Sequence, residues 1–356
     1  MTMKIKLAIL ESDKTYLERL VSAFSIKYSD KLEIYSFTNL EVAVNTVVSN
    51  RVDVFLVHES FEIDRKTLPT RCAFAYLVDS IGVDSVKNEV AISKFQKADL
   101  IYKQILSLFS ENNSSITGLH VDDHEDAKVI AFQSPAGGTG CSTAAAACAV
   151  SLANKNYKVL YLNLEKFGSA DVFFNAEGNS DFSDIIYAIK SKKGNLSLKL
   201  ESAVKQDATG VFFYSATKMA LDMAELNCSE IKKLISDLKL FGGYNYIILD
   251  FDFSISKDSL ELLKECNSIV LVSDGSAISN KKLERAVESL NIIEQQTEMK
   301  LLIRTGVLFN RVSSKTSQKP NLPDIKEYGG IKRYEGYQAQ QMLIELSKLA
   351  VFDALA

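Results

Sequence analysis

The stretch VIAFQSPAGGTGCSTAAAACAVSLAN, residues 129–154, constrains the fold of this chain more than any other. An apolar run of strand type leads into a glycine-rich turn, and a pattern of small residues typical of a packed helix follows. Gly137, Gly138 and Gly140 permit close backbone approach and unusual dihedral angles. Successive N–H groups and the positive end of the helix can then face phosphates, so the stretch predicts a phosphate-binding loop.

The other residues of this loop complete a candidate nucleotide site. Ser142 and Thr143 supply hydroxyls at the start of the predicted helix, and Ser142 is placed to bind Mg²⁺. The predicted nucleotide-binding residues of the loop are Gly137, Gly138, Thr139, Gly140, Cys141, Ser142 and Thr143. Taken alone, the loop is equally compatible with a plain tight turn between a strand and a helix. Motifs elsewhere in the chain are needed to distinguish a phosphate-binding loop from such a turn.

Short apolar runs alternate with helical patterns along the chain, which is typical of parallel α/β sheets. The polar stretch ENNSSITGLHVDDHEDAK, residues 111–128, shows no apolar periodicity and is the predicted linker. We therefore expect residues 1–110 to form one α/β domain and residues 129–356 a second, larger one. A length of 356 residues is ample for two cores.

Composition narrows the class of protein. Hydrophobic residues make up 47% of the chain and charged residues 24%, as in soluble globular proteins. A net charge of −4 argues against nucleic-acid binding through a general excess of positive charge and favours protein partners. Five cysteines without a C-x-x-C pair indicate neither a disulfide framework nor a zinc site. The sequence shows no signal core and no membrane span of roughly 18 apolar residues, so we expect a cytoplasmic protein.

The loop resembles the deviant Walker A motif of the MinD/ParA family, whose pattern is K-G-G-x-G-K-[ST]. Pro135 replaces the usual preceding glycine, Ala136 the signature lysine, and Cys141 the general P-loop lysine. This pattern is closer to the TadZ/CpaE branch, pilus-assembly relatives of MinD in which these lysines are often replaced. A lost charge-assisted hydrogen bond costs about 1.5–3 kcal/mol. We expect ATP binding through backbone amides and Mg²⁺ to persist, and hydrolysis to be slow or absent, because phosphoryl transfer needs positive charge at the transition state.

Three later motifs follow in the order of the same family. Asp250 ends the apolar run YIILD like a Walker B aspartate and is the second predicted Mg²⁺ residue, with Ser142. Asn163 and Glu165 occupy the positions of two acidic residues, and the resemblance gives Glu165 the role of positioning the attacking water. Asn310 and Arg311 resemble the Asn-Arg pair that meets the adenine ring. This order favours nucleotide binding over a decayed fold that binds nothing.

The first domain resembles a receiver domain. Glu11 and Asp13 match its acidic cluster, but His58 stands where the phosphoacceptor aspartate belongs, and Lys94 alone matches the Lys-Pro-aromatic segment. We expect no phosphorylation here and an interaction role instead, with His58 a structural surface histidine. A flavodoxin-like module unrelated to receivers remains an alternative. The expected fold class is α/β throughout: a flavodoxin-like, receiver-like parallel sheet followed by a doubly wound P-loop sheet of the MinD/ParA type.

The resemblance implies an ATP-dependent assembly and localisation factor of the TadZ/CpaE type, acting with a type IVb-like pilus or secretion machine, often at a cell pole. Its mechanism would be nucleotide-controlled homodimerisation, although Ala136 cannot make the lysine contact that crosses the dimer in relatives. A cycling partition or positioning ATPase is the alternative. We rank it second because both lysines are missing and because the C-terminal helical pattern, with Met342, Leu343, Leu346 and Leu349, fits a core helix better than a membrane-targeting one. A two-component output regulator ranks last, since it needs the missing aspartate.

Overall fold

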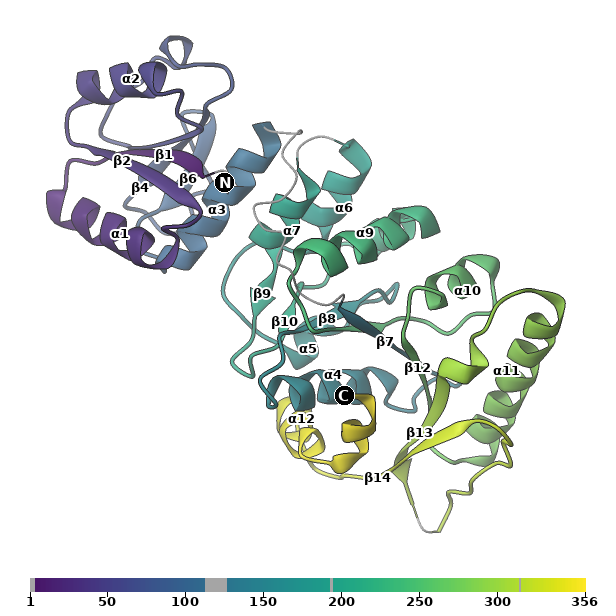
Figure 1. Cartoon of the computed structure of the whole chain (residues 1–356). Helices are drawn as coiled ribbons and strands as arrows, with labels where there is room; N and C mark the ends of the chain where they lie inside the picture. The colour runs from purple at the N-terminus through teal and green to yellow at the C-terminus, as the bar shows by residue number, and fades with distance from the viewer. Residues whose placement is uncertain (1–3, 113–126, 193–194, 314) are drawn as a thin grey trace. The chain divides into compact units, whose positions relative to one another are not determined.

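The computed structural model describes residues 4–112, 127–192, 195–313 and 315–356, which form two units (Figure 1). The first unit takes in the described part of residues 1–121 together with that of 187–203, and the second takes in the described remainder. The predicted linker, residues 111–128, falls almost entirely outside the described residues. Segment 187–203 therefore packs with the unit that precedes it in the chain, although 1–110 and 129–356 were the expected domain ranges.

A six-stranded sheet in the order β2-β1-β3-β4-β6-β5 forms the centre of the first unit. Its strands are β1 (Ile5–Leu10), β2 (Leu32–Phe37), β3 (Val54–His58), β4 (Ala73–Val78), β5 (Ser85–Val86) and β6 (Glu89–Ser93). All pairings are parallel except that of β5 with β6. The order of the first five strands is the flavodoxin-like order, which confirms the predicted fold class for this unit.

Three helices of the first half cover this sheet: α1 (Lys14–Lys27), α2 (Leu40–Ser49) and α3 (Ala98–Asn112). The side chain of Asp13 caps α1 by accepting hydrogen bonds from the N–H groups of Thr15 and Tyr16, and Asn39 caps α2 in the same way through Val42. Between β3 and β4 the described chain forms only a short 3₁₀ turn, η1 (Arg65–Thr67), and between β4 and β6 only the strand β5.

Helix α7 (Leu196–Ala203) completes the core of the first unit from a distant part of the sequence. Leu198 is fully buried in the same apolar cluster as the residues of β1, β3 and β4. Lys199 Nζ donates to Ser107 Oγ of α3 over 2.8 Å, and Lys31 forms an ion pair with Glu201. The sheet of this unit is thus covered by a helix that nothing in the first 110 residues encodes.

An eight-stranded sheet in the order β14-β13-β12-β7-β11-β8-β10-β9 forms the second unit. Its strands are β7 (Lys128–Gln133), β8 (Val159–Asn163), β9 (Lys205–Gln206), β10 (Phe212–Phe213), β11 (Tyr246–Asp250), β12 (Ser268–Ser273), β13 (Thr305–Val312) and β14 (Lys326–Lys332). Among the described strands of this sheet, β9 and β10 are the one antiparallel pair. This is the doubly wound, mostly parallel sheet that the alternating pattern predicted.

The helices of the second unit are α4 (Cys141–Ala153), α5 (Ala170–Phe173), α8 (Ala220–Glu225), α9 (Cys228–Phe241), α10 (Lys257–Leu263), α11 (Ala277–Gln296) and α12 (Ala339–Ser347), with the 3₁₀ turns η2 (Leu302–Arg304) and η3 (Ala350–Leu355); α6 (Phe182–Ser191) spans the division between the units. Helix α4 lies against β7, β8 and β11 and packs on α12 (Figure 1).

The small residues of α4 explain this close packing. Residues 144–150 of this helix are all buried, because alanines and one cysteine let its backbone approach the sheet on one side and α12 on the other. Leu343 and Leu346 of α12 are buried in the same core, and Met342 and Leu349 pack against it. The C-terminal pattern is therefore a core helix, as predicted. In the part of the chain that the structure describes, every helix is too short or too polar to cross a membrane.

Candidate functional site

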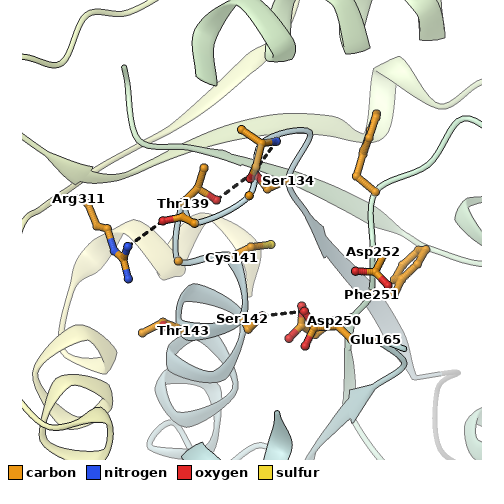
Figure 2. A pocket seen from close by; sticks show the side chains of 15 residues that line it. Ser134, Thr139, Cys141, Ser142, Thr143, Glu165, Asp250, Phe251, Asp252 and Arg311 are labelled. Carbon is orange, nitrogen blue, oxygen red and sulfur yellow. Dashed lines mark hydrogen bonds between the residues drawn. The ribbon is translucent and has the colours of Figure 1, made fainter. Parts of the chain in front are cut away.

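The glycine-rich loop runs from the end of β7 to the start of α4, at the carboxyl edge of the second sheet (Figure 2). Gly138 and Gly140 have φ angles of 80° and 77°, and Gly140 is the N-cap of α4. Thr139 Oγ1 donates to Ser134 Oγ over 2.9 Å, and Ser134 Oγ lies 2.6 Å from the carbonyl oxygen of Val272 on β12. Hydrogen bonds across the loop and to the neighbouring strand thus hold its shape.

Asn310 and Arg311, near the end of β13, hold the other side of this loop. Asn310 Nδ2 donates to the carbonyl oxygens of Thr139 and Gly140 over 2.9 and 3.2 Å. Arg311 donates from its guanidinium to the carbonyl oxygen of Gly138 over 2.7 Å. The pairing of β13 with β14 is irregular at this point and Arg311 has a φ of 56°, so a bulge re-aims the two side chains toward the loop. We refer to this pair of residues as the loop clamp.

A buried acidic centre lies beside the loop, at the ends of β8 and β11. Asp250 is 1% exposed, and its Oδ2 accepts hydrogen bonds from Tyr161 OH over 2.6 Å and from Asn163 Nδ2 over 3.1 Å. Asn163 Nδ2 also donates to Glu165 Oε2 over 2.8 Å, and Ser142 Oγ donates to Glu165 Oε1 over 3.3 Å. The register that sets Asp250 beside Asn163 across the two strands brings these groups together.

Burial dominates the electrostatics of this centre. Burial, together with the negative charge of Glu165, raises the pKa of Asp250 to about 7, against hydrogen bonds that favour its charged form. Burial and the charges of Asp250 and Glu165 also raise the pKa of the Cys141 thiol well above its usual value, so this side chain is neutral at the position of the P-loop lysine. The two carboxyl groups therefore carry less than their full negative charge at neutral pH, and the residues at the two lysine positions of the loop do not balance what remains.

A cavity of about 330 Å³ lies between the loop and the acidic centre. It is lined by Ser134, Ala136, Gly137, Gly138, Thr139, Gly140, Cys141, Ser142, Thr143, Glu165, Asp250, Phe251, Asp252, Phe253 and Arg311. Among these lining residues Arg311 is the only basic one. Figure 2 shows Ser142, Glu165 and Asp250 close together on one side and Arg311 on the other.

The donor set of this cavity fits a nucleotide with Mg²⁺. The hydroxyl of Ser142 and the carboxylates of Asp250 and Glu165 are oxygen ligands of the kind that Mg²⁺ prefers. A side chain placed on Gly137 or Gly138 would meet no atom within 4 Å, so the backbone there faces open space. The N-terminus of α4 directs backbone N–H groups toward the same cavity, as phosphate binding requires.

The structure brings most of the predicted site residues to one place. All seven loop residues, Glu165, Asp250 and Arg311 line the cavity, whereas Asn310 is buried and holds the loop. The predicted roles, with adenine at Asn310 and Arg311 and water at Glu165, stay predictions. Sequence reasoning missed Tyr161 and Ser134. Tyr161 precedes Asn163 by two residues in a strand and so shares its face, a signal that could have indicated it.

At the receiver-like site of the first unit, Lys94 forms ion pairs with two carboxylates. Lys94 Nζ lies 2.9 Å from Glu11 Oε2 and 3.1 Å from Asp79 Oδ1. The hydrogen bond from Lys94, with its charge, lowers the pKa of Asp79. His58, the last residue of β3, is 8% exposed and lies against Ser60 and Asp79, so the expectation of a surface histidine is wrong.

Family models match both parts of the chain. Residues 3–110 match the model described as "TadZ-like, receiver domain", and residues 127–303 match an AAA domain model. A comparison with curated proteins found no match. Among solved structures, a ParA family ATPase from Chlorobium tepidum is 22% identical with a TM-score of 0.50, covering 65% of this chain and 98% of that one. A chain of the MinC:MinD cell division protein complex of Aquifex aeolicus is 18% identical with a TM-score of 0.47, covering 62% of this chain and 95% of that one.

The doubly wound sheet and its phosphate-type loop define a P-loop protein with the ParA/MinD fold. The two parts of the chain match the models of a TadZ-like receiver domain and of an AAA domain, and the second part has the fold of ParA/MinD ATPases. The resemblance seen in the sequence is thereby confirmed, and the reading of the first domain as a module unrelated to receivers is set aside.

Proposed function

We propose that this protein is an ATP-binding assembly and localisation factor of the TadZ/CpaE type, working in the cytoplasm with a type IVb-like (Tad) pilus or secretion machine. ATP and Mg²⁺ would control its homodimerisation, with weak hydrolysis or none. The match to a TadZ-like receiver domain joined to a ParA/MinD-like domain supports a positioning or assembly role. The partners would be a second copy and other assembly proteins, often at a cell pole, and no nucleic acid.

The observation that supports this proposal most is which charged and neutral side chains line the cavity. Carboxylates and hydroxyls suited to Mg²⁺ are kept, while a buried alanine and a neutral thiol occupy the two lysine positions. Binding can rely on backbone amides, Mg²⁺ and Arg311. The negative charge that develops on a transferring phosphoryl group would lack the lysine that normally stabilises it. ATP would therefore act as a bound ligand rather than as a substrate that is hydrolysed.

Each residue of the site has a part in this proposal. The amides of residues 137–143 would face the phosphates, Ser142 and Asp250 would hold the Mg²⁺, and Glu165 would position water in any residual hydrolysis. Asn310 and Arg311 would meet the adenine ring. A dimer would form because ATP binds it more tightly than the monomer, and that difference in affinity is all such a switch needs.

The test is a titration of the purified chain with ATP and Mg²⁺ that follows bound nucleotide, released phosphate and mass in solution together. We expect binding with a dimeric mass and negligible phosphate release. The variant Cys141→Lys, which restores the P-loop lysine, should tighten ATP binding by roughly ten- to a hundredfold, as one charge-assisted hydrogen bond predicts. Cys141→Met, a larger but neutral side chain, is the matched control and should bring no such gain.

Other results of this titration would support other functions. Brisk phosphate release by the unmodified chain would reject the switch and favour the cycling ParA/MinD-type positioning ATPase. Failure to bind ATP at millimolar concentration, with both Cys141 variants equally inactive, would mean that the loop is a structural remnant and the protein a scaffold.

A further inference from the structure

The carboxyl ends of β3 and β4 bring three potential metal ligands together in the first unit. His58 is the last residue of β3, Glu59 follows it, and Asp79 follows β4. One ligand atom from each of these residues lies within 4.8 Å of those of the other two. The chain thus presents one imidazole and two carboxylates to a single point, outside the nucleotide site.

The Nε2 atom of the His58 imidazole faces this point and makes only a long contact with Asp79. This atom is buried and, among the described residues, has no hydrogen-bond partner. The distance from Nε2 to Asp79 Oδ2 is 3.4 Å, too long for a good hydrogen bond. Two ligand atoms that each lie about 2.0–2.1 Å from a tetrahedral metal ion are separated by about 3.3–3.4 Å. The two atoms therefore already stand at the separation that a shared ion requires.

Neighbouring groups hold the three ligands in this arrangement. His58 Nδ1 lies 2.7 Å from Ser60 Oγ and accepts the backbone N–H of Ser60 over 3.3 Å, so Ser60 orients the ring. Binding of a metal ion at Nε2 requires the ring proton to move to Nδ1, where Ser60 Oγ can accept it. Glu59 Oε1 accepts from the backbone N–H of Asp79 over 3.0 Å. Lys94 lies 3.1 Å from Oδ1 of Asp79, the oxygen that does not face His58. Such outer contacts orient ligands in known metal sites.

Charge and access also suit a divalent ion. The neutral imidazole and the two carboxylates carry two negative charges, and Lys94 is shared with Glu11. The side chain of Asp79 is 55% exposed, so an ion can enter from solvent and keep a water molecule in its fourth position. Glu11 and Asp13, which match the acidic cluster of receivers, are not part of this group.

We propose that His58, Glu59 and Asp79 form a binding site for a divalent transition-metal ion, with Zn²⁺ the ion that one imidazole and two carboxylates suit best. The bound ion ties the ends of β3 and β4 together at the place where a receiver would carry its phosphoryl group. The degenerate receiver is then a metal-binding module, which goes beyond the proposed function of the nucleotide site.

The experiment is a competition between the full chain and a chromophoric chelator for Zn²⁺, without nucleotide. We expect one equivalent of Zn²⁺ to bind to the unmodified chain, and the variants His58→Gln and Asp79→Asn each to bind at least tenfold more weakly. Asp13→Asn, which changes the receiver-type acidic cluster, and Asp250→Asn, which changes the nucleotide site, are the matched controls and should bind Zn²⁺ as the unmodified chain does. Circular dichroism verifies that all variants are folded.

Substitution with Co²⁺ gives a readout independent of affinity. We expect visible bands of a site with nitrogen and oxygen ligands, lost in His58→Gln, and no thiolate-to-metal charge-transfer band. The proposal is overturned if His58→Gln and Asp79→Asn keep full Zn²⁺ affinity, if Asp13→Asn or Asp250→Asn abolishes binding, if no Zn²⁺ binds, or if a thiolate band shows that the free cysteines hold the ion.

Discussion

At the scale of single residues, the buried carboxyl group of Asp250 links the candidate nucleotide site to pH. It lies among Tyr161, Asn163 and the charge of Glu165, with almost no access to solvent. A pKa near 7 means that close to half of the molecules carry a proton there at neutral pH. A divalent ion favours the charged form, so binding of one at this site would release that proton.

The same shift predicts how stability depends on pH. The pKa of Asp250 is about 7 in the folded chain and near its ordinary value of 3.8 in the unfolded chain, so the folded state binds more protons between these values. The free energy of unfolding should therefore fall as pH rises from about 4 to 7, by up to about 1.4 kcal/mol per pH unit. Asp250→Asn should lack this contribution. Denaturant unfolding at several pH values measures how the free energy of unfolding depends on pH in the unmodified chain and in Asp250→Asn. Equal pH dependence in the two proteins would contradict the raised pKa of Asp250.

Some site residues could be predicted from the sequence and others could not. Ser142, Glu165 and Asp250 follow strand ends or a glycine loop in a fixed order, and these local signals place them at one sheet edge. Asn310 and Arg311 were also predicted as site residues, but their role as a clamp depends on a bulge in β13 and on contact with a loop 170 residues earlier. No local pattern reports either feature.

At the scale of elements, the loop clamp limits which residues can occupy the N-cap position of α4. Gly138 and Gly140 both have positive φ, where an L side chain is strained by about 1–2 kcal/mol. They differ in their surroundings: a Cβ on Gly140 would lie 2.5 Å from Asn310 Nδ2, whereas one on Gly138 would meet nothing within 4 Å. Substitution of Gly138 therefore tests backbone strain alone, whereas substitution of Gly140 tests strain together with loss of the loop clamp.

We expect Gly138→Ala to lower the free energy of unfolding by about 1 kcal/mol and Gly140→Ala by about 2–3 kcal/mol, because the latter also breaks the hydrogen bonds of Asn310. Denaturant titration of the two variants beside the unmodified chain measures the difference. Equal losses would mean that Asn310 moves aside without cost and does not clamp the loop.

At the scale of the whole molecule, the alternation of apolar and helical patterns predicted both sheets, but not which core each helix joins. The sequence LSLKLESA of α7 is an ordinary amphipathic pattern, and only long-range packing assigns Leu198 to the core of the first unit. Helix identity is a local property encoded within a few turns, whereas the choice of packing partner depends on the completed fold.

Leu198→Ala tests this assignment. The substitution should lower the stability of the first unit by about 2–5 kcal/mol, because it leaves a cavity in a closed core. Hydrogen exchange should then speed up at β1 and β3 and stay unchanged at β7 and β11. Leu196→Ala, at a half-buried position of the same helix, is the control and should have a smaller effect. Faster exchange confined to β7 and β11 would show that α7 belongs to the second unit and would contradict its assignment to the first.

The return of residues 187–203 to the first unit has a consequence for dissection and recombination of this chain. A protease cut within residues 111–128 would yield two fragments that remain associated, since the second fragment carries the helix that closes the hydrophobic core of the first. For the same reason, a gene segment ending at codon 110 would encode an incomplete module. Exchange of the receiver between relatives would require two separate stretches of sequence to move together.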